Sequence, residues 1–481
     1  MNYKKILVAV VGVLSIASCT ANFEETNTDP NRLQKIYPST LLNPIIYEAA
    51  SHGLYRSWSH NNQFMQANVA FPSSVDGIQR YDFSDDIGSS SWNAYYRWIK
   101  NARDMEKEAI KVADANYEAI AITLRVWMAA NLTDLFGPIP YFDASQGDSG
   151  KLLPKFDNQE DIYASFFDDL ERANSLYDTG KALKFNPDIL FTDGGAYWKR
   201  WQKFTNSLHL RLLLRASNRA EVGAYDKMVA MLNDPVKYPV IESNEESVVL
   251  DITGITPNVS PWSRIQDFTL SKKMASFFID HLVAFEDPRL PIYATEAYRI
   301  ENKKKVYIGY KGIPSAWDGP DSQFDYEASG LNNEMAKNPT KAPILTYAEL
   351  LFIKAELGVK GYLPDAEKNY KEAVKSAITQ FEIEVPANYF DKAEVAFDGS
   401  LEKVMLQKYY ALYMTDYQQW FEYKRTGLPE LPKTQSMLNN GVMPSRFPFP
   451  LSIRTQNRTE YEKIVGEMGG DDINVKMWWQ N

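Results

Sequence analysis

The sequence predicts an all-α fold in which helical hairpins stack into a curved superhelix, with few short strands. Three observations lead to this prediction. Apolar residues recur at helical spacing over several long segments, Gly-Pro and Gly-Gly pairs separate these segments, and similar hairpins return along the chain. Each hairpin leaves an apolar face uncovered, and stacking neighbouring hairpins buries those faces.

The first hairpin is predicted near residues 89–136. After Ser89-Ser90-Ser91, apolar side chains from Trp92 to Ala109 follow a helical period. A second helix is expected from about Tyr117 to Phe136. It ends at Gly137-Pro138, because glycine terminates a helix readily and proline cannot continue one.

Later segments repeat this arrangement. Helices are expected from Ile162 to Ala173 and from Trp198 to Leu212, with the break Gly194-Gly195 between them. Another pair combines residues 347–357 (YAELLFIKAEL) with a segment in which Ala366, Tyr370 and Ala373 follow the small/aromatic/small pattern by which tetratricopeptide (TPR) helices pack. The last long helix is expected from Leu401 to Arg425.

Three long stretches, residues 53–90, 235–268 and 286–345, show no clean period. They are rich in Gly, Pro, Ser, Asn and aromatic residues, and they are too long to be simple connectors. We expect them to form loops, short helices and a few short strands, such as Val306 to Tyr310, on one side of the helical scaffold.

The first residues have the features of a lipoprotein signal peptide. Lys4 and Lys5 precede a short apolar run, and small residues stand directly before Cys19, the single cysteine of the chain. The run is shorter than the roughly 20 apolar residues that span a bilayer. We therefore predict a signal peptide over residues 1–18, a lipidated polar tether over 19–36 that begins at Cys19, and one helical domain over 37–481.

The charge of the chain excludes one class of partner. The formal net charge is −10, and it becomes −12 when Lys4 and Lys5 leave with the signal peptide, because 50 basic residues then face 62 acidic ones. Nucleic-acid binding depends on clustered Lys and Arg. We expect no nucleic-acid partner.

The sequence gives no sign of a metal, a cofactor or a catalytic centre. The histidines lack a second histidine at metal-ligand spacing, and the chain has no cysteine pair, P-loop, dinucleotide fingerprint or hydrolase nucleophile motif. Glycoside hydrolysis is the harder alternative, because it needs only two carboxylates at a set separation. Acidic pairs exist, but Asp168-Asp169 fits the solvated face of an amphipathic helix, so we predict a binding protein without catalytic residues or cofactor.

Seven segments occur in one order along nearly the whole chain. They are Cys19 with NTDPN (27–31), DLFGPIPYFDA (134–144), WKRWQKFTNSLHLRLLLRAS (198–217), PILTYAELLFIKAE (343–356), QKYYALYMTDYQQWFEYKRTG (407–427), RFPFP (446–450) and GGDDINVKMWW (469–479). Together they resemble the SusD/RagB-like family, the nutrient-binding outer-membrane lipoproteins of Bacteroidota.

The resemblance implies a right-handed superhelix of four TPR-like hairpins with a loop-rich ligand-binding side. It also implies a lipid anchor in the outer membrane, a body that faces the cell exterior, and capture of an oligosaccharide for a SusC-like TonB-dependent transporter. Two alternatives stay open. The ligand is a peptide, as for RagB-type relatives, or the protein is a scaffold or lid with no ligand site of its own.

Loop aromatics are the candidates for sugar contacts, because flat apolar rings stack on sugar C–H faces while nearby polar groups bond the hydroxyls. Ligand contacts vary within the family, so these candidates rest on local sequence alone. The aromatic candidates in irregular segments are Trp58, Tyr81, Trp262, Tyr310 and Trp317. The polar candidates beside them are Asn61, Gln63, Arg80, Arg264 and Asp318.

Overall fold

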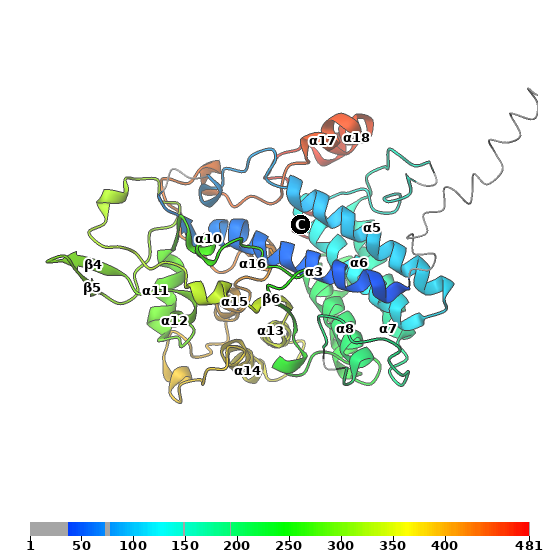
Figure 1. Cartoon of the computed structure of the whole chain (residues 1–481), viewed down its shortest axis with the longest axis horizontal. Helices are drawn as coiled ribbons and strands as arrows, with labels where there is room; N and C mark the ends of the chain where they lie inside the picture. The colour runs from blue at the N-terminus through cyan, green and yellow to red at the C-terminus, as the bar shows by residue number, and fades with distance from the viewer. Residues whose placement is uncertain (1–36, 73–76, 148–149, 193, 481) are drawn as a thin grey trace, which may run out of the picture.

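A computed structural model describes residues 37–72, 77–147, 150–192 and 194–480. The predicted signal peptide and the tether with Cys19 lie outside the described residues, so the boundaries at 18 and 36 stay predictions. Figure 1 shows helices α5 to α8 gathered on one side, α13 and α14 below the centre, and loops with short strands on the opposite side.

The described chain is mostly helical. Its helices are α3 (Pro38–Arg56), α4 (Asn62–Phe64), α5 (Ser89–Lys111), α6 (Ala115–Phe136), α7 (Gln159–Leu176), α8 (Tyr197–Arg215), α9 (Ala224–Asn233), α10 (Ile265–Thr269), α11 (Ser276–Phe285), α12 (Leu290–Tyr293), α13 (Tyr347–Val359), α14 (Ala366–Thr379), α15 (Leu401–Ala411), α16 (Gln418–Thr426), α17 (Leu451–Gln456) and α18 (Arg458–Met468), with a π-helical turn η1 (Ser57–Asn61). The predicted all-α class, with few short strands, is confirmed.

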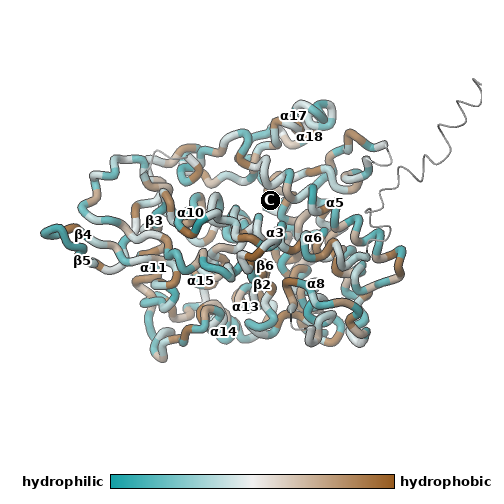
Figure 2. Tube along the Cα trace, viewed as in Figure 1, coloured by the Kyte–Doolittle hydropathy of each residue, from teal (hydrophilic) through white to brown (hydrophobic). Residues whose placement is uncertain are grey.

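The strands form three separate antiparallel pairs. They are β1 (Asn68–Ala70) with β3 (Lys272–Met274), β2 (Val248–Ile252) with β6 (Thr340–Leu345), and β4 (Tyr298–Glu301) with β5 (Lys304–Tyr307). The expected strand over residues 306–310 therefore begins earlier and ends at Tyr307. The β4–β5 hairpin projects from the loop-rich side and is strongly hydrophilic (Figure 2).

The first predicted hairpin forms as expected. Helices α5 and α6 pack together, and α6 stops at Phe136 because Gly137 adopts a positive φ of 83°. Among the described helices, α6 has the length and apolar composition of a membrane span, but its apolar window lies wholly inside the protein. It is a central helix, covered by neighbours on all sides.

The predicted helix from Leu401 to Arg425 is wrong in one respect, because the structure divides it into α15 and α16. Met414 and Asp416 both have positive φ, at 67° and 31°, which no continuous helix accommodates. Asp416 is buried, and one of its carboxylate oxygens accepts hydrogen bonds from the Tyr417 backbone N–H and from Gln418 Nε2 at 2.9 Å. The hydrogen bonds of this carboxylate stabilise the non-helical turn between α15 and α16.

The expected irregular stretch from residue 53 also differs from the structure. Helix α3 continues to Arg56 and passes directly into the π-helical turn η1 and the short α4. A π turn widens the helix by one residue and redirects the side chains that follow. Residues 57–64 are therefore an extension of α3, and most of them point into the protein.

A buried polar cluster joins α6, α7 and α8 to Trp479. Asp134, at the end of α6, accepts hydrogen bonds from Tyr163 (2.7 Å), from Arg215 (2.8 Å) and from the indole of Trp479 (2.8 Å). All four side chains are almost fully buried. The DLFGP segment, α7, α8 and the GGDDINVKMWW segment meet at this carboxylate. Sequence segments far apart in the chain are thus fixed to one another.

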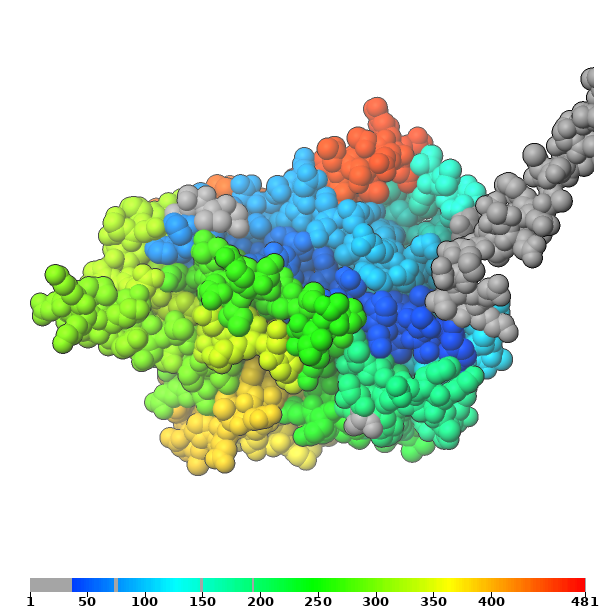
Figure 3. Space-filling view, viewed as in Figure 1, coloured from blue at the N-terminus to red at the C-terminus, as the bar shows by residue number. Residues whose placement is uncertain are grey.

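One main hydrophobic core draws apolar side chains from helices along the chain, from α3 to α18. A second, small core lies on the loop-rich side and contains Val69, Ala275, Ile313 and Ala328. In the space-filling view the segment that holds α10 covers part of α3 (Figure 3). The loop-rich side is therefore built directly against the extended end of α3.

Candidate functional site

Two of the predicted aromatics meet at the end of α3. Trp58 lies in η1, and its ring centroid is 5.9 Å from that of Trp262, with the planes at 78°. Phe268 from α10 stacks on the Trp58 ring at 6.4 Å, and its carbonyl accepts a hydrogen bond of 2.8 Å from the Trp58 indole. Tyr55 contacts the same ring at 5.2 Å. We call these four residues the Trp58 cluster.

The Trp58 cluster is buried on one side and accessible on the other. Trp262 is 4% exposed and Phe268 is fully buried, whereas Tyr55 and Trp58 are half-buried. The Lys272 ammonium lies 4.7 Å from the centroid of the Trp58 ring. The arrangement gives a fixed indole with part of its surface in solvent and the ammonium of the largely buried Lys272 over its ring, and the exposed part of the ring is available to contact a sugar.

Arg264 lies near this cluster in sequence and is fully accessible. Its side chain is 72% exposed and pairs with Asp267 at 2.6 Å, at the start of α10. The hydrogen bond from Arg264 lowers the pKa of the Asp267 carboxyl. Both side chains can hydrogen-bond a ligand, although each would then give up part of its ion pair with the other.

A second aromatic group lies next to β1, the strand that pairs with β3, and β3 begins at Lys272. We call this strand pair the β1–β3 ribbon. Phe71 follows Ala70, which pairs with Lys272, and the Phe324 ring contacts both Phe71 (6.0 Å) and Trp317 (4.9 Å). Trp317 is half-buried against the small core. Trp58 and Trp317 therefore both lie close to the β1–β3 ribbon.

Arg80 and Asp318 form an ion pair beside Trp317. Their charged atoms are 3.3 Å apart, with side chains 27% and 40% exposed. Arg80 Nε also donates to the Ser436 carbonyl at 2.7 Å, and the Ser436 hydroxyl donates to Asp318. These contacts fix two partly exposed polar groups next to an aromatic ring, as a sugar site requires.

Three predicted residues face the interior. The Asn61 amide donates to Gln419 Oε1 at 2.7 Å and its oxygen accepts from the Trp420 backbone N–H at 3.2 Å. Gln63 donates to the Ser59 carbonyl, and Tyr81, 3% exposed, accepts from Gln66 at 3.1 Å. Because the π turn and a positive φ of 67° at Tyr81 direct these side chains inward, their polar groups serve the fold.

Tyr310 stands apart from both aromatic groups. It follows β5 and is half-buried against the main core, whereas Trp317 packs on the small core. Burial raises the pKa of its hydroxyl. The structure therefore brings Trp58 with Trp262, and Arg80 with Trp317 and Asp318, but not all the predicted residues into one site.

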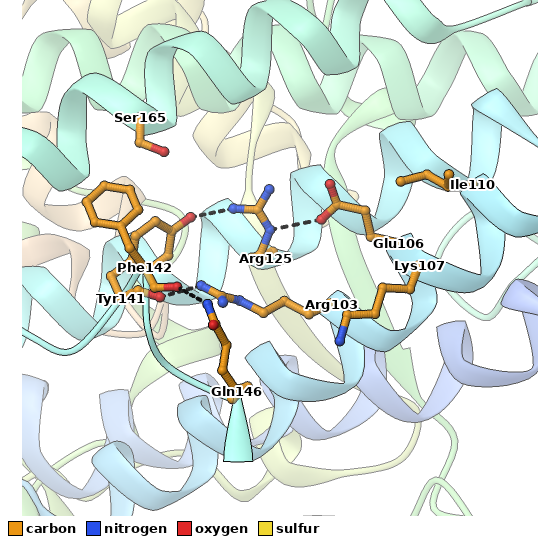
Figure 4. Close-up of a pocket in the computed structure, with 10 residues that line it drawn as sticks. Arg103, Glu106, Lys107, Ile110, Arg125, Tyr141, Phe142, Gln146 and Ser165 are labelled. Carbon is orange, nitrogen blue, oxygen red and sulfur yellow. Dashed lines mark hydrogen bonds and ion pairs between the residues drawn. The ribbon is translucent and has the colours of Figure 1, made fainter. Parts of the chain in front are cut away.

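Two cavities of the structure have no counterpart among the sequence predictions. One, of about 490 Å³, has an apolar floor that includes Tyr293, Phe381 and Tyr413, and a charged rim that includes Glu334 and Lys341. The other, of about 560 Å³, lies between α5, α6, α7 and the residues after α6 (Figure 4). Polar residues on helical faces, such as those that line the second cavity, look like ordinary surface residues in a sequence. Only the folding of the hairpin shows that they face each other.

Among the described ranges, no group of three or more His, Cys, Asp or Glu side chains is placed to hold a metal ion. The scaffold, its loop-rich side and the aromatic groups on it define the class of the molecule as a stack of helical hairpins with partly exposed aromatic groups on one side. Comparison with known proteins then gives the family.

The chain belongs to the SusD-like family. The family model described as "Starch-binding associating with outer membrane" matches residues 30–450. None of the curated proteins compared with the chain is similar enough to match it. The family description associates these proteins with the outer membrane, and the predicted resemblance is confirmed.

Solved structures share the fold over almost the whole chain. A putative outer membrane protein of Bacteroides vulgatus, described as probably involved in nutrient binding, is 24% identical with a TM-score of 0.78, and the match covers 93% of this chain and 100% of that one. A SusD homologue of Bacteroides fragilis is 22% identical with a TM-score of 0.77 and the same coverage. A chitin-binding SusD homologue of Flavobacterium johnsoniae is 21% identical with a TM-score of 0.76, covering 92% and 98%. At these identities the comparisons establish the fold.

Proposed function

We propose that this protein captures an oligosaccharide at the surface of the outer membrane and delivers it to a SusC-like TonB-dependent transporter. Lipid attached to Cys19 anchors the protein, with its body facing the cell exterior. The family description and a chitin-binding structural relative support a glycan as the ligand. The alternatives are a peptide ligand or a lid without its own site.

The Trp58 cluster is the observation that carries this proposal. A sugar presents a C–H face to an aromatic ring and hydroxyls around its edge. The half-buried Trp58 indole is held by a hydrogen bond to Phe268 and by packing on Trp262, so a ligand finds the ring already ordered. Preorganisation of this kind lowers the entropy cost of binding.

Polar groups for the sugar hydroxyls lie on both sides of the ribbon. Lys272 lies over the Trp58 ring, the exposed Arg264 stands two residues after Trp262, and the Arg80–Asp318 pair includes the residue that follows Trp317. An oligosaccharide presents several sugar rings and so can use more than one aromatic group, whereas a monosaccharide contacts one. The arrangement therefore favours an extended glycan chain as ligand.

The ionisation of Asp267, the carboxylate next to Phe268 of the Trp58 cluster, fits binding without hydrolysis. A glycosidase needs a general acid, which is a carboxyl group with a raised pKa. The hydrogen bond from Arg264 instead lowers the pKa of Asp267, so this carboxyl stays ionised. A permanently ionised carboxylate serves as a hydrogen-bond acceptor for sugar hydroxyls.

Affinity electrophoresis and calorimetry with chitooligosaccharides, maltooligosaccharides and a peptide panel test the proposal. We expect the Trp58→Ala variant to lose at least about tenfold in glycan affinity, which corresponds to ~1.4 kcal/mol. Tyr362→Ala is the matched control, because Tyr362 is 42% exposed and stacks on Tyr225, on another part of the protein. Tyr362→Ala keeps wild-type affinity.

Three results would contradict the proposal. Heat from peptides alone would identify a peptide-binding protein, and no heat from any ligand would identify a scaffold that acts through the transporter. Equal losses in the Trp58 and Tyr362 variants would remove the Trp58 cluster from the binding site.

A further inference from the structure

The cavity beside the first hairpin has the size of a small-molecule site. Its volume is about 560 Å³, within the range of roughly 300 to 1,000 Å³ that ligand pockets occupy. Helix α5 contributes Arg103, Glu106 and Lys107, helix α6 contributes Arg125, and the segment after α6 contributes Tyr141 and Phe142 (Figure 4). It shares no lining residue with the Trp58 cluster.

Arg103 is the unusual group in this cavity. Its two terminal nitrogens donate to the carbonyls of Ala144, at 2.9 Å, and of Tyr141. Its Nε atom is buried and has no hydrogen-bond partner, and no carboxylate of a described residue lies within ion-pair distance of the guanidinium. A guanidinium carries five donors. The Arg103 guanidinium therefore keeps N–H donors without acceptors and a positive charge without an ion-pair partner among the described residues.

The neighbouring arginines are matched by carboxylates. Arg125 pairs with Glu106 at 3.2 Å and with Asp169 at 2.9 Å. Arg172 holds the other oxygen of Glu106 at 2.7 Å. Glu106 is thus shared between two other arginines, and its charge acts on Arg103 only at longer range, without an ion pair between them. The cavity lining contains three cations, Arg103, Lys107 and Arg125, and one acid.

Lys107 adds weakly compensated positive charge at the rim. Its ammonium lies 3.9 Å from Asp104, which Lys100 already binds at 2.6 Å. In a protein of formal net charge −10, an excess of positive charge inside a cavity is a local and specific feature. An anion entering the cavity meets Arg103 and Lys107 from the same helix, one turn apart.

The remaining lining supports a ligand that is also partly apolar. Phe142 is 40% exposed and Ile110 is 55% exposed, and both line the cavity. Ser145, Gln146 and Ser165 lie around them. An open aromatic ring, hydroxyl and amide groups, and an unmatched guanidinium are the complement of a sugar ring that carries a carboxylate.

We propose that this cavity is a second binding site, which takes an acidic sugar of the uronic-acid type. The carboxylate binds Arg103 and Lys107, and the ring lies on Phe142. The inference rests on the proposed function only in that the ligand is a sugar. An uncharged glycan fits the Trp58 cluster, whereas the carboxylate selects this cavity.

Titration of the full-length lipidated protein in detergent with glucuronic acid, glucose, acetate and inorganic phosphate tests the site. We expect glucuronic acid to bind at least tenfold more tightly than each of the other three. Equal binding of glucuronic acid and glucose would overturn a charge-selective site. Equal binding of acetate or phosphate would show a general anion site and overturn the sugar assignment.

Two variants assign the binding to this cavity. Arg103→Gln is expected to weaken glucuronic acid at least tenfold, and Phe142→Ala to weaken glucuronic acid but not acetate. Lys111→Gln, at the end of α5 and 73% exposed in its side chain, is the matched control and keeps wild-type affinity. Full affinity in both cavity variants would overturn the proposal.

The outcome is independent of the first site. Trp58→Ala is expected to leave glucuronic acid binding unchanged, so a failure of the Trp58 proposal is visible separately. If Arg103→Gln does not fold, as judged by its circular dichroism, Phe142→Ala and Lys107→Gln on the open side of the cavity decide the question alone.

Discussion

Arg425 binds Glu356 through two parallel hydrogen bonds, each 2.6 Å long, from its two terminal nitrogens to the two carboxylate oxygens. The pair joins α16 to α13, and both side chains are almost fully buried. Glu422, one turn before Arg425, accepts a third bond of 2.7 Å. The Arg425 guanidinium therefore attaches α16 to α13.

Replacing Arg425 by Ala is expected to lower the free energy of unfolding by about 3 to 5 kcal/mol, because Glu356 is then buried without its partner, whereas Glu422 keeps its ion pair with Lys408. Denaturant unfolding followed by circular dichroism measures the change. Arg458→Ala is the control, since Arg458 pairs with Glu462 in an exposed i,i+4 arrangement that contributes little. Similar losses in the two variants would show that the buried pair has no special role.

His209 is expected to make stability depend on pH. It is 7% exposed on α8 and stacks on Phe167 at 5.7 Å, and burial lowers its pKa from 6.5 to about 4. Between these values the unfolded chain binds a proton that the folded protein excludes. Stability is therefore complete above pH 6.5 and falls as the pH drops toward 4, by about 1.4 kcal/mol per pH unit for one such histidine.

Unfolding of the His209→Phe variant between pH 7.5 and 4.5 checks this origin. The variant should lose less stability on acidification than the wild type, because its unfolded chain no longer gains a proton at position 209. His60, buried and with its pKa lowered to about 3, remains and keeps part of the dependence. An unchanged slope in the variant would assign the acid sensitivity to other groups.

Trp58 and Trp262 should separate binding from stability. Trp262→Ala removes a buried ring and is expected to destabilise the fold by about 3 to 5 kcal/mol. Trp58→Ala removes a half-exposed ring, so its main effect is on glycan affinity, with less than half that loss of stability. Thermal unfolding and affinity electrophoresis on both variants test the distinction. The reverse order of stability losses would mean that Trp58, and not Trp262, is the packing residue.

Cys19→Ser is expected to abolish lipid attachment. Labelling with palmitate should mark the wild-type protein and not the variant, and the variant should leave the membrane fraction. Membrane retention of an unlabelled variant would require another anchor. Proteinase K added to whole cells should degrade the wild-type body, and survival of that body would contradict an outward orientation while leaving lipidation untouched.

The helical scaffold was predictable because its signal is local. Helices α5 and α6 follow from apolar periodicity and from the glycine at residue 137, which needs a positive φ. The break between α15 and α16 was not predictable, since residues 412–417 have ordinary helix-forming composition. It depends on the buried Asp416 carboxylate, which Asn131 contacts from α6 at 3.3 Å. Such tertiary contacts override helix propensity.

The candidate site was predictable only in part. Composition pointed to Trp58 and Trp262, but nothing in the sequence indicated that their rings lie 5.9 Å apart. Asn61 and Gln63 seemed equally accessible, yet the π-helical turn directs both inward. Arg103 was missed because one arginine on an amphipathic helix is ordinary. Its missing carboxylate partner becomes visible only when α5, α6 and α7 are assembled.

The hydrogen bond between Trp479 and Asp134 ties α6 to a residue far along the chain. The two residues are 345 positions apart, so during synthesis the α6 carboxylate waits for most of the chain before its last partner exists. Until then, Asp134 can accept hydrogen bonds only from its other two donors, Tyr163 and Arg215. Any truncation that removes Trp479 therefore leaves this buried carboxylate short of one donor, at a point distant in sequence from the cut.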